Sequence, residues 1–124
     1  MWLAIVAVRA AAAQPPDAAN VERVWTKCST CHSRDGASTG VGPDLDGLSG
    51  RPAGRLKGYK YSSAFRHATF VWDAARLDAF LTDPQKVVPG TAMAFSGLHD
   101  ARDRALLVCL LLETCESLSR PTDR

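Results

Sequence analysis

The segment Cys28-Ser29-Thr30-Cys31-His32 carries the most specific chemistry of this chain. Two thiols three residues apart, followed directly by an imidazole, have the spacing that attaches a c-type haem. On one turn of helix each cysteine can take one vinyl group of the porphyrin, and His32 can donate a ring nitrogen to the iron. Because Cys-x-x-Cys also occurs in zinc sites and thiol redox proteins, this interpretation needs a second iron ligand elsewhere.

Met93 is the candidate for that ligand, because Met1 is the only other methionine. A lone methionine on a helix is more often core filler. Met93, however, lies on an irregular segment that Pro89 and Gly90 restrict, and its thioether could reach the iron face opposite His32. A thioether is a soft, neutral donor that raises the reduction potential of a haem.

Two histidines compete with Met93 as the sixth ligand. His67 lies near the end of an expected helix beside Arg66, and His99 precedes Asp100 in a polar turn. We expect both imidazoles to be solvated at the surface.

Composition places the chain among small globular proteins. Its 124 residues fit one domain, of which 46% are apolar but only 7% aromatic, so the polypeptide alone builds a modest core. A haem would add a large apolar disc to that core. The formal net charge is +2, and the charges are scattered, so we expect no nucleic-acid partner.

The N-terminus has the pattern of an export signal, with departures from it. Residues 1–13 contain an apolar run and a small-residue cleavage site, but no basic residue precedes the run and Arg9 follows it. The run is too short to span a bilayer. We expect a signal peptide over 1–13, imperfect or truncated, a flexible leader over 14–16, one domain over 17–124 and a periplasmic location. The alternative is a buried or frayed N-terminal helix.

The expected fold class is all-α, because no segment alternates as a half-buried strand does. Apolar spacing and an Asp or Ser at the start predict four helices. Two irregular stretches separate them, and a long loop of this kind usually wraps something. The expected helices cover about 17–27, 62–67, 73–83 and 100–112, and the irregular stretches cover 33–58 and 85–94.

Cys109 and Cys115 lie outside the haem motif. If one helix carried both, their α-carbons would be about 9 Å apart at a rise of 1.5 Å per residue, beyond disulfide reach. A bridge would require the helix to end near Glu113 and the chain to turn back. We therefore expect two buried, inert thiols.

With these residues in hand, the chain resembles the class I cytochromes c, the soluble type that includes mitochondrial cytochrome c and bacterial relatives. The resemblance runs from about Asp17 to Leu112. Its motifs are CSTCH, GPDLDGLSGR (Gly42–Arg51), GYKYSSAF (Gly58–Phe65), Trp72, FLTDPQKVVPGTAMAF (Phe80–Phe95) and a final amphipathic helix. It implies three main helices with short helices and long loops around one haem.

The resemblance also implies how the haem is bound. Cys28 and Cys31 would form the thioethers, with His32 as the proximal and Met93 as the distal iron ligand. The carbonyl group of Pro43 would accept a hydrogen bond from the other ring nitrogen of His32 and so orient the ring.

Four further positions match residues around the haem propionates. Arg51, Tyr61 and Trp72 would hold a buried propionate by charge and hydrogen bonds, because an unpaired anion in an apolar pocket is costly. Thr91 matches a hydroxyl of the same network. The alternatives are a core role for Trp72 and a solvated loop charge for Arg51.

Several positions depart from the family pattern. Phe80 and Phe65 replace a tyrosine and an asparagine of the distal polar network, which predicts a drier pocket and a changed reduction potential. Val24 and Leu110 replace aromatic residues where the first and last helices meet, and Asn20 replaces a glycine there. We expect an aliphatic contact between these helices.

These features predict a monomeric electron carrier rather than an enzyme. Its partners would be redox protein donors and acceptors, such as those of a respiratory chain, and two protein ligands leave the iron no open position. The alternative is a haem peroxidase or a gas or redox sensor in which Met93 detaches readily. A haem-free thiol or zinc protein would leave the GPDL, GYKY and PGTAM segments unexplained.

Overall fold

The described part of the chain is helical. The computed structural model describes residues 18–37 and 41–115, which contain no strand beyond an isolated bridge between Pro52 and Val71. This confirms the expected all-α fold class. The helices are α1 (Ala18–Ser29), α2 (Ser63–Arg66), α3 (Ala74–Thr82), α4 (Pro84–Val87) and α5 (Ala101–Leu112).

Three of the expected helix starts are confirmed by capping side chains. Ser62 accepts a hydrogen bond at the start of α2, Asp73 accepts one from the N–H of Arg76 in α3, and Asp100 caps α5. Each side chain satisfies a backbone donor that the helix leaves unpaired. Asp17, the cap expected for the first helix, lies outside the described residues, as do the expected signal peptide (1–13) and leader (14–16).

The expectation of an irregular chain directly after residue 84 is wrong. Pro84 opens α4, and the carboxylate of Asp83 accepts a hydrogen bond from the N–H of Lys86 at 3.3 Å. Proline suits the first turn of a helix because its missing N–H has no intrahelical partner there. The same proline that ends α3 therefore begins a helical turn.

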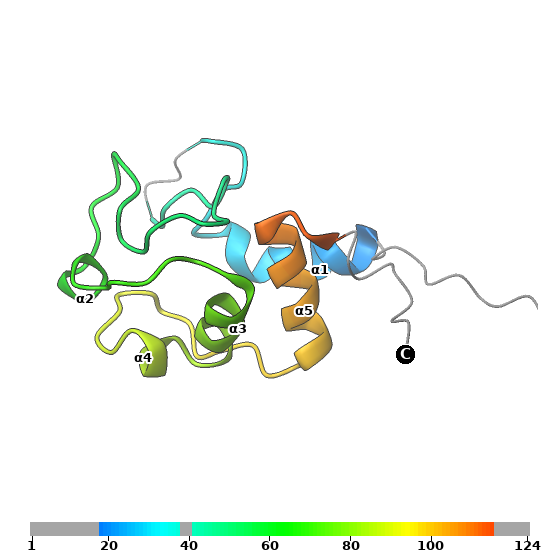
Figure 1. Cartoon of the computed structure of the whole chain (residues 1–124). Coiled ribbons are helices and arrows are strands. Elements are labelled where there is room, and N and C mark those ends of the chain that lie inside the picture. The colour runs from blue at the N-terminus through cyan, green and yellow to red at the C-terminus, as the bar shows by residue number, and fades with distance from the viewer. Residues whose placement is uncertain (1–17, 38–40, 116–124) are drawn as a thin grey trace, which may run out of the picture.

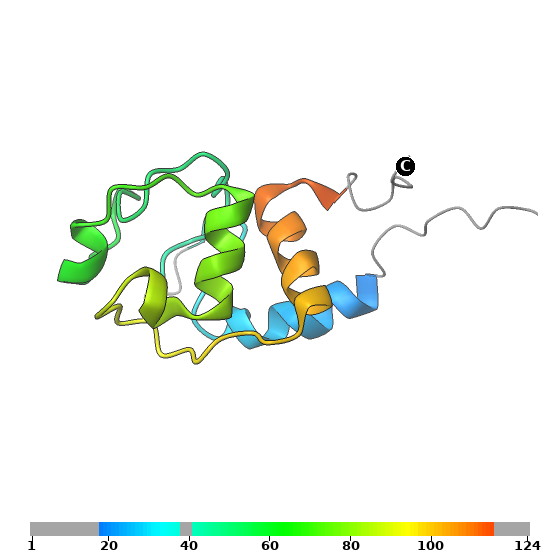
Figure 2. The ribbon, with the colours of Figure 1, turned by 60° about the horizontal axis from the view of Figure 1, so that its bottom comes forward.

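Helices α1, α3 and α5 form the centre of the molecule. Helix α5 crosses α1 and runs beside α3 (Figures 1 and 2). Val24 of α1 and Leu107 of α5 are each 1% exposed and belong to one core cluster, so the expected aliphatic packing of these helices is present. At the surface, Arg23 of α1 binds Asp103 of α5 at 2.7 Å, and this hydrogen bond lowers the pKa of the carboxyl group.

Long segments extend from one side of the three helices, the chain before α3 along one edge and the chain after it along the other (Figure 2). Backbone hydrogen bonds hold both segments. The N–H of Trp72 donates to Arg51 at 3.0 Å, and the N–H of Leu98 donates to Leu81 at 2.7 Å. The first bond closes the segment before α3 on itself, and the second joins the segment after α4 to α3. None of the helices within 18–37 and 41–115 has the length and apolar character needed to cross a bilayer.

Cys109 and Cys115 form a disulfide, so the expectation of two inert thiols is wrong. The α-carbons are 4.6 Å apart because α5 ends at Leu112 and the chain turns back. Glu113 makes that turn with φ 58°, the left-handed region that non-glycine residues seldom adopt. The N–H of Thr114 then donates to the carbonyl oxygen of Cys109 at 2.9 Å.

Reducing this disulfide should lower the free energy of unfolding by about 2 kcal/mol, because the bridge restricts a short loop of the unfolded chain. Urea unfolding with and without a phosphine reductant measures the change. A Cys109→Ser/Cys115→Ser double variant is the control, since the reductant should leave it unaffected. Equal midpoints for the oxidised and reduced unmutated protein would contradict the prediction.

Candidate functional site

Cys28, Cys31 and His32 lie where α1 ends. The N–H groups of Cys31 and His32 both point to the carbonyl oxygen of Cys28, at 3.1 and 2.9 Å, so the three side chains follow one tight turn. The two cysteines are half-buried and not joined in a disulfide. Burial raises the pKa of the Cys28 thiol. Thiol redox enzymes need the opposite shift, which makes the thiolate.

The imidazole of His32 is oriented by the backbone of the loop that follows. Its Nδ1 lies 2.8 Å from the carbonyl oxygen of Pro43. A carbonyl oxygen can only accept, so Nδ1 carries the hydrogen and Nε2 keeps a lone pair for a metal. This is the contact expected from the sequence, and it fixes both the tautomer and the ring orientation.

Gly42 allows the loop to approach the imidazole closely. A Cβ atom at this position would lie 2.7 Å from Cε1 of His32 and 2.8 Å from the carbonyl oxygen of Cys31. The N–H of Gly42 also donates to the carbonyl oxygen of Cys31 at 2.8 Å. Any side chain here would push the Pro43 carbonyl group away from His32.

Asp44 ties the same loop together. Its carboxylate accepts hydrogen bonds from the hydroxyl of Ser33, from the N–H of Gly36 at 3.0 Å and from the N–H of Asp46 at 2.8 Å. Burial alone would raise the pKa of Asp44, but these bonds and the charge of Arg51 together lower it. Asp44 was not among the site residues expected from the sequence, although its place directly after Gly42 and Pro43 was a usable signal.

Arg51 and Trp72, two of the expected propionate residues, lie on paired backbone segments. The guanidinium of Arg51 donates to the carbonyl oxygens of Asp44 at 2.9 Å and Asp46 at 3.3 Å, so it is held against the loop while the side chain stays half-exposed. Trp72 is 7% exposed and packs edge-on against Phe70 and Phe80.

Tyr61 joins the same region through the ring of Phe65. Ring centroids of Tyr61 and Phe65 are 5.9 Å apart, and those of Phe65 and Trp72 are 6.4 Å apart. The hydroxyl of Tyr61 accepts a hydrogen bond from the N–H of Leu56 at 3.3 Å, and burial raises its pKa. Arg51, Tyr61 and Trp72 are therefore brought into one neighbourhood.

Met93 and Thr91 lie on the other long segment. Thr91 is 6% exposed, and its hydroxyl accepts a hydrogen bond from the N–H of Met93 at 3.3 Å. The side chain of Met93 is half-buried and packs against the core cluster. In the described part of the chain, no hydrogen bond or ring contact links these two residues to Arg51, Tyr61 or Trp72. The competing residues His67 and His99 are exposed, as expected.

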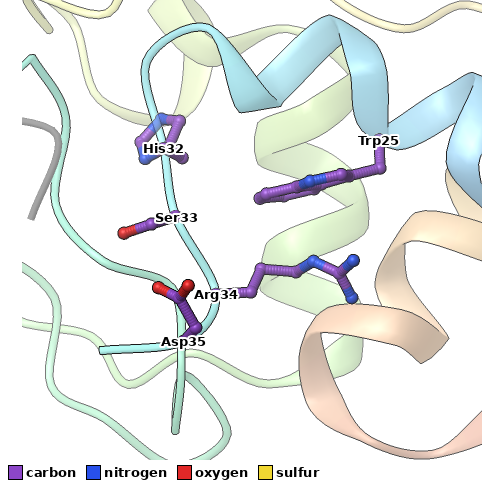
Figure 3. A pocket seen from close by; sticks show the side chains of 5 residues that line it. All are labelled: Trp25, His32, Ser33, Arg34 and Asp35. Carbon is purple, nitrogen blue, oxygen red and sulfur yellow. The ribbon is translucent and has the colours of Figure 1, made fainter. Parts of the chain in front are cut away.

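A cavity of about 340 Å³ borders His32 on one side (Figure 3). Trp25 forms one wall, and the guanidinium of Arg34 lies 4.5 Å from the centre of the indole ring. Ser33 and Asp35 complete the lining. The space beside the imidazole is therefore hollow and not filled by core side chains.

The donor set fits a covalently attached haem. Two thiols on one turn, an imidazole with Nε2 available and a thioether on a separate loop are the groups that such a cofactor requires. Within residues 18–37 and 41–115, no three His, Cys, Asp or Glu side chains are grouped to hold an ion by themselves. The cysteine pair thus lacks the further side chains that a structural zinc site uses.

Comparison with known proteins gives the family. A cytochrome c2 from Rhodoblastus acidophilus is 44% identical over 90 residues, covering 72% of this chain and 82% of that protein. A cytochrome c from Sesamum indicum is 40% identical over 103 residues, covering 82% and 93%. No protein-family model matches the chain.

A solved structure agrees with the sequence relatives. Cytochrome cH from Methylobacterium extorquens superposes with a TM-score of 0.67 at 34% identity, covering 82% of this chain and 98% of that one. The chain therefore belongs to the class I cytochrome c family, and its cofactor is one covalent haem c with its iron.

Proposed function

We propose that this protein carries single electrons between redox proteins through a haem attached to Cys28 and Cys31, with His32 and Met93 as the iron ligands. The family is one of electron carriers. The observation that carries the finer assignment is the 2.8 Å contact between Nδ1 of His32 and the Pro43 carbonyl oxygen. It leaves Nε2 as the metal donor beside the two cysteines that would hold the porphyrin.

On the His32 side of the haem, the protein backbone would orient the ligand. The Pro43 carbonyl group takes the Nδ1 hydrogen, which makes the imidazole a better electron donor at Nε2. Asp44 holds the loop behind that carbonyl group through Ser33, Gly36 and Asp46. The imidazole would then need little rearrangement when the charge at the iron changes.

The haem supplies the one-electron Fe(III)/Fe(II) couple when it is bound. With His32 and Met93 both donating, the chain would leave no open position for a substrate. A carrier, rather than a peroxidase or a sensor, follows from that arrangement, and no contact in the described part favours either alternative.

Arg51, Tyr61 and Trp72 would hold a haem propionate. One N–H group of each terminal nitrogen of Arg51 donates to a carbonyl oxygen, that of Asp44 or of Asp46. The other N–H groups of the guanidinium remain as donors. The Tyr61 hydroxyl accepts from Leu56 and keeps its own hydrogen to donate. Burial of a carboxylate becomes tolerable when several such donors meet it. Thr91 would contribute to the same network.

We further propose export to the periplasm, a monomeric state and docking to redox protein donors and acceptors. The N-terminal pattern over residues 1–13 supports export. Attachment of haem c also takes place outside the cytoplasm.

Visible spectroscopy of the holoprotein tests the ligand set. After expression with haem-maturation machinery, the oxidised protein should show a far-red sulfur-to-iron band that peroxide does not change. A Met93→Ala variant should lose the band and keep the covalent haem, which visible spectra and denaturing gels measure. Covalent haem without the band in the unmutated protein would contradict Met93 ligation, and no covalent haem would contradict the whole proposal.

Gly42→Ala should raise the reduction potential. The added methyl group would displace the Pro43 carbonyl group and weaken electron donation by His32. A net hydrogen bond of about 1 kcal/mol corresponds to roughly 40 mV for one electron. Potentiometric titration measures the shift. Gly47→Ala is a control for glycine replacement, because its Cβ would meet no atom within 4 Å and only its positive φ adds strain. A potential that does not change in Gly42→Ala would count against the orienting role.

Phe80→Tyr should change the potential and the strength of the Met93–iron bond. The ring of Phe80 is 5% exposed and packs against Phe65 and Trp72, so the site offers no hydroxyl there. A tyrosine would bring a buried hydrogen-bond donor into an apolar region. The potential and the far-red band measure the effect, and identical values in both proteins would exclude a dry distal pocket.

A further inference from the structure

The segment that carries Met93 begins with a tight turn. The N–H of Thr91 donates to the carbonyl oxygen of Val88 at 3.0 Å, with Pro89 and Gly90 as the central residues. Gly90 has φ 84°, as the third position of a type II turn requires, and proline is favoured at the second. The turn thus has a defined shape two residues before Met93.

The side chain of Gln85 forms hydrogen bonds with the second half of this turn. Its Oε1 accepts a hydrogen bond from the N–H of Gly90 at 3.1 Å, and its Nε2 donates to the carbonyl oxygen of Thr91 at 3.0 Å. Gln85 belongs to α4, which lies beside the segment that follows it (Figure 1). One amide group therefore holds the second half of the turn, at Gly90 and Thr91, against the preceding helix.

Thr91 in turn restricts the backbone of Met93. The Thr91 side chain is buried at 6% exposure, and its hydroxyl accepts from the N–H of Met93 at 3.3 Å. Gln85 fixes the carbonyl group of Thr91, and Thr91 fixes the backbone of Met93. This chain of contacts therefore holds the backbone from which the thioether of Met93 projects.

We propose that Gln85 is a positioning residue for Met93, whose amide bridge sets how strongly the thioether competes with outside ligands for the iron. The proposal rests on the proposed ligation by Met93. When the turn is preformed, little conformational entropy is lost as the sulfur binds. When the turn is loose, the ligating conformation is a smaller fraction of the ensemble, and its apparent affinity falls by that fraction.

The test is imidazole binding to the oxidised holoprotein, because imidazole must displace Met93 to bind. Gln85→Ala should bind imidazole about fivefold more tightly, because the turn loses two hydrogen bonds that are accessible to water and so lie at the low end of the net range. Gln85→Glu keeps an acceptor for the Gly90 N–H but has no donor for the Thr91 carbonyl group. Its affinity for imidazole should therefore lie between those of the unmutated protein and Gln85→Ala. Lys86→Ala is the matched control, because this neighbour on α4 has no side-chain hydrogen bond to any described residue.

A second readout separates positioning from general stability. Amide hydrogen exchange at Gly90 should be faster in Gln85→Ala but not in Lys86→Ala, and in neither variant should exchange in α1 and α5 change as much. If the unmutated protein lacks the far-red band, the proposed ligation and the role of Gln85 both fail. If the band is present but Gln85→Ala binds imidazole as Lys86→Ala does, the role of Gln85 alone is overturned.

Discussion

The hydrogen bond between Nδ1 of His32 and the carbonyl oxygen of Pro43 is the contact on which the site depends. It requires the loop after the cysteine motif to return to its starting point, and a glycine at position 42, because a Cβ atom would meet the imidazole. The return in turn needs Asp44, whose carboxylate gathers hydrogen bonds from both ends of the loop. The hydrogen bond at one ring nitrogen thus constrains both described ends of the loop, residues 33–36 and 42–46.

The helices and the loops differ in how deeply they bury their apolar side chains. Helices α1, α3 and α5 carry most of the buried apolar residues, including Val24 and Leu107. The segments outside these three helices are rich in glycine and proline, and several of their apolar side chains are partly exposed while packing against that core: Leu45, Phe65, Phe70, Met93 and Phe95. An apolar disc such as haem would cover a surface of this kind and join the loops to the helices.

Local signals and the family resemblance predicted helix starts and the contact between His32 and Pro43, whereas contacts that form only when a short turn closes were not predicted. The caps Ser62, Asp73 and Asp100 are local signals, and the motif of Cys28, Cys31 and His32 has its spacing built in. The Cys109–Cys115 disulfide was missed because the estimate assumed a continuous helix, whereas Glu113 turns the chain. Gln85 gave no signal, since its partners Gly90 and Thr91 become neighbours only once the turn forms.

The two sides of the proposed iron site are held by contacts of different strength. On the His32 side, a backbone carbonyl group and the charged Asp44 act together, and charge-assisted hydrogen bonds are roughly twice as strong as neutral ones. On the Met93 side, the contacts are neutral and Gln85 is exposed, so water competes for them. Ligand exchange should therefore occur on the Met93 side. The reduction potential is then adjustable there by substitutions that leave the attachment of the haem untouched.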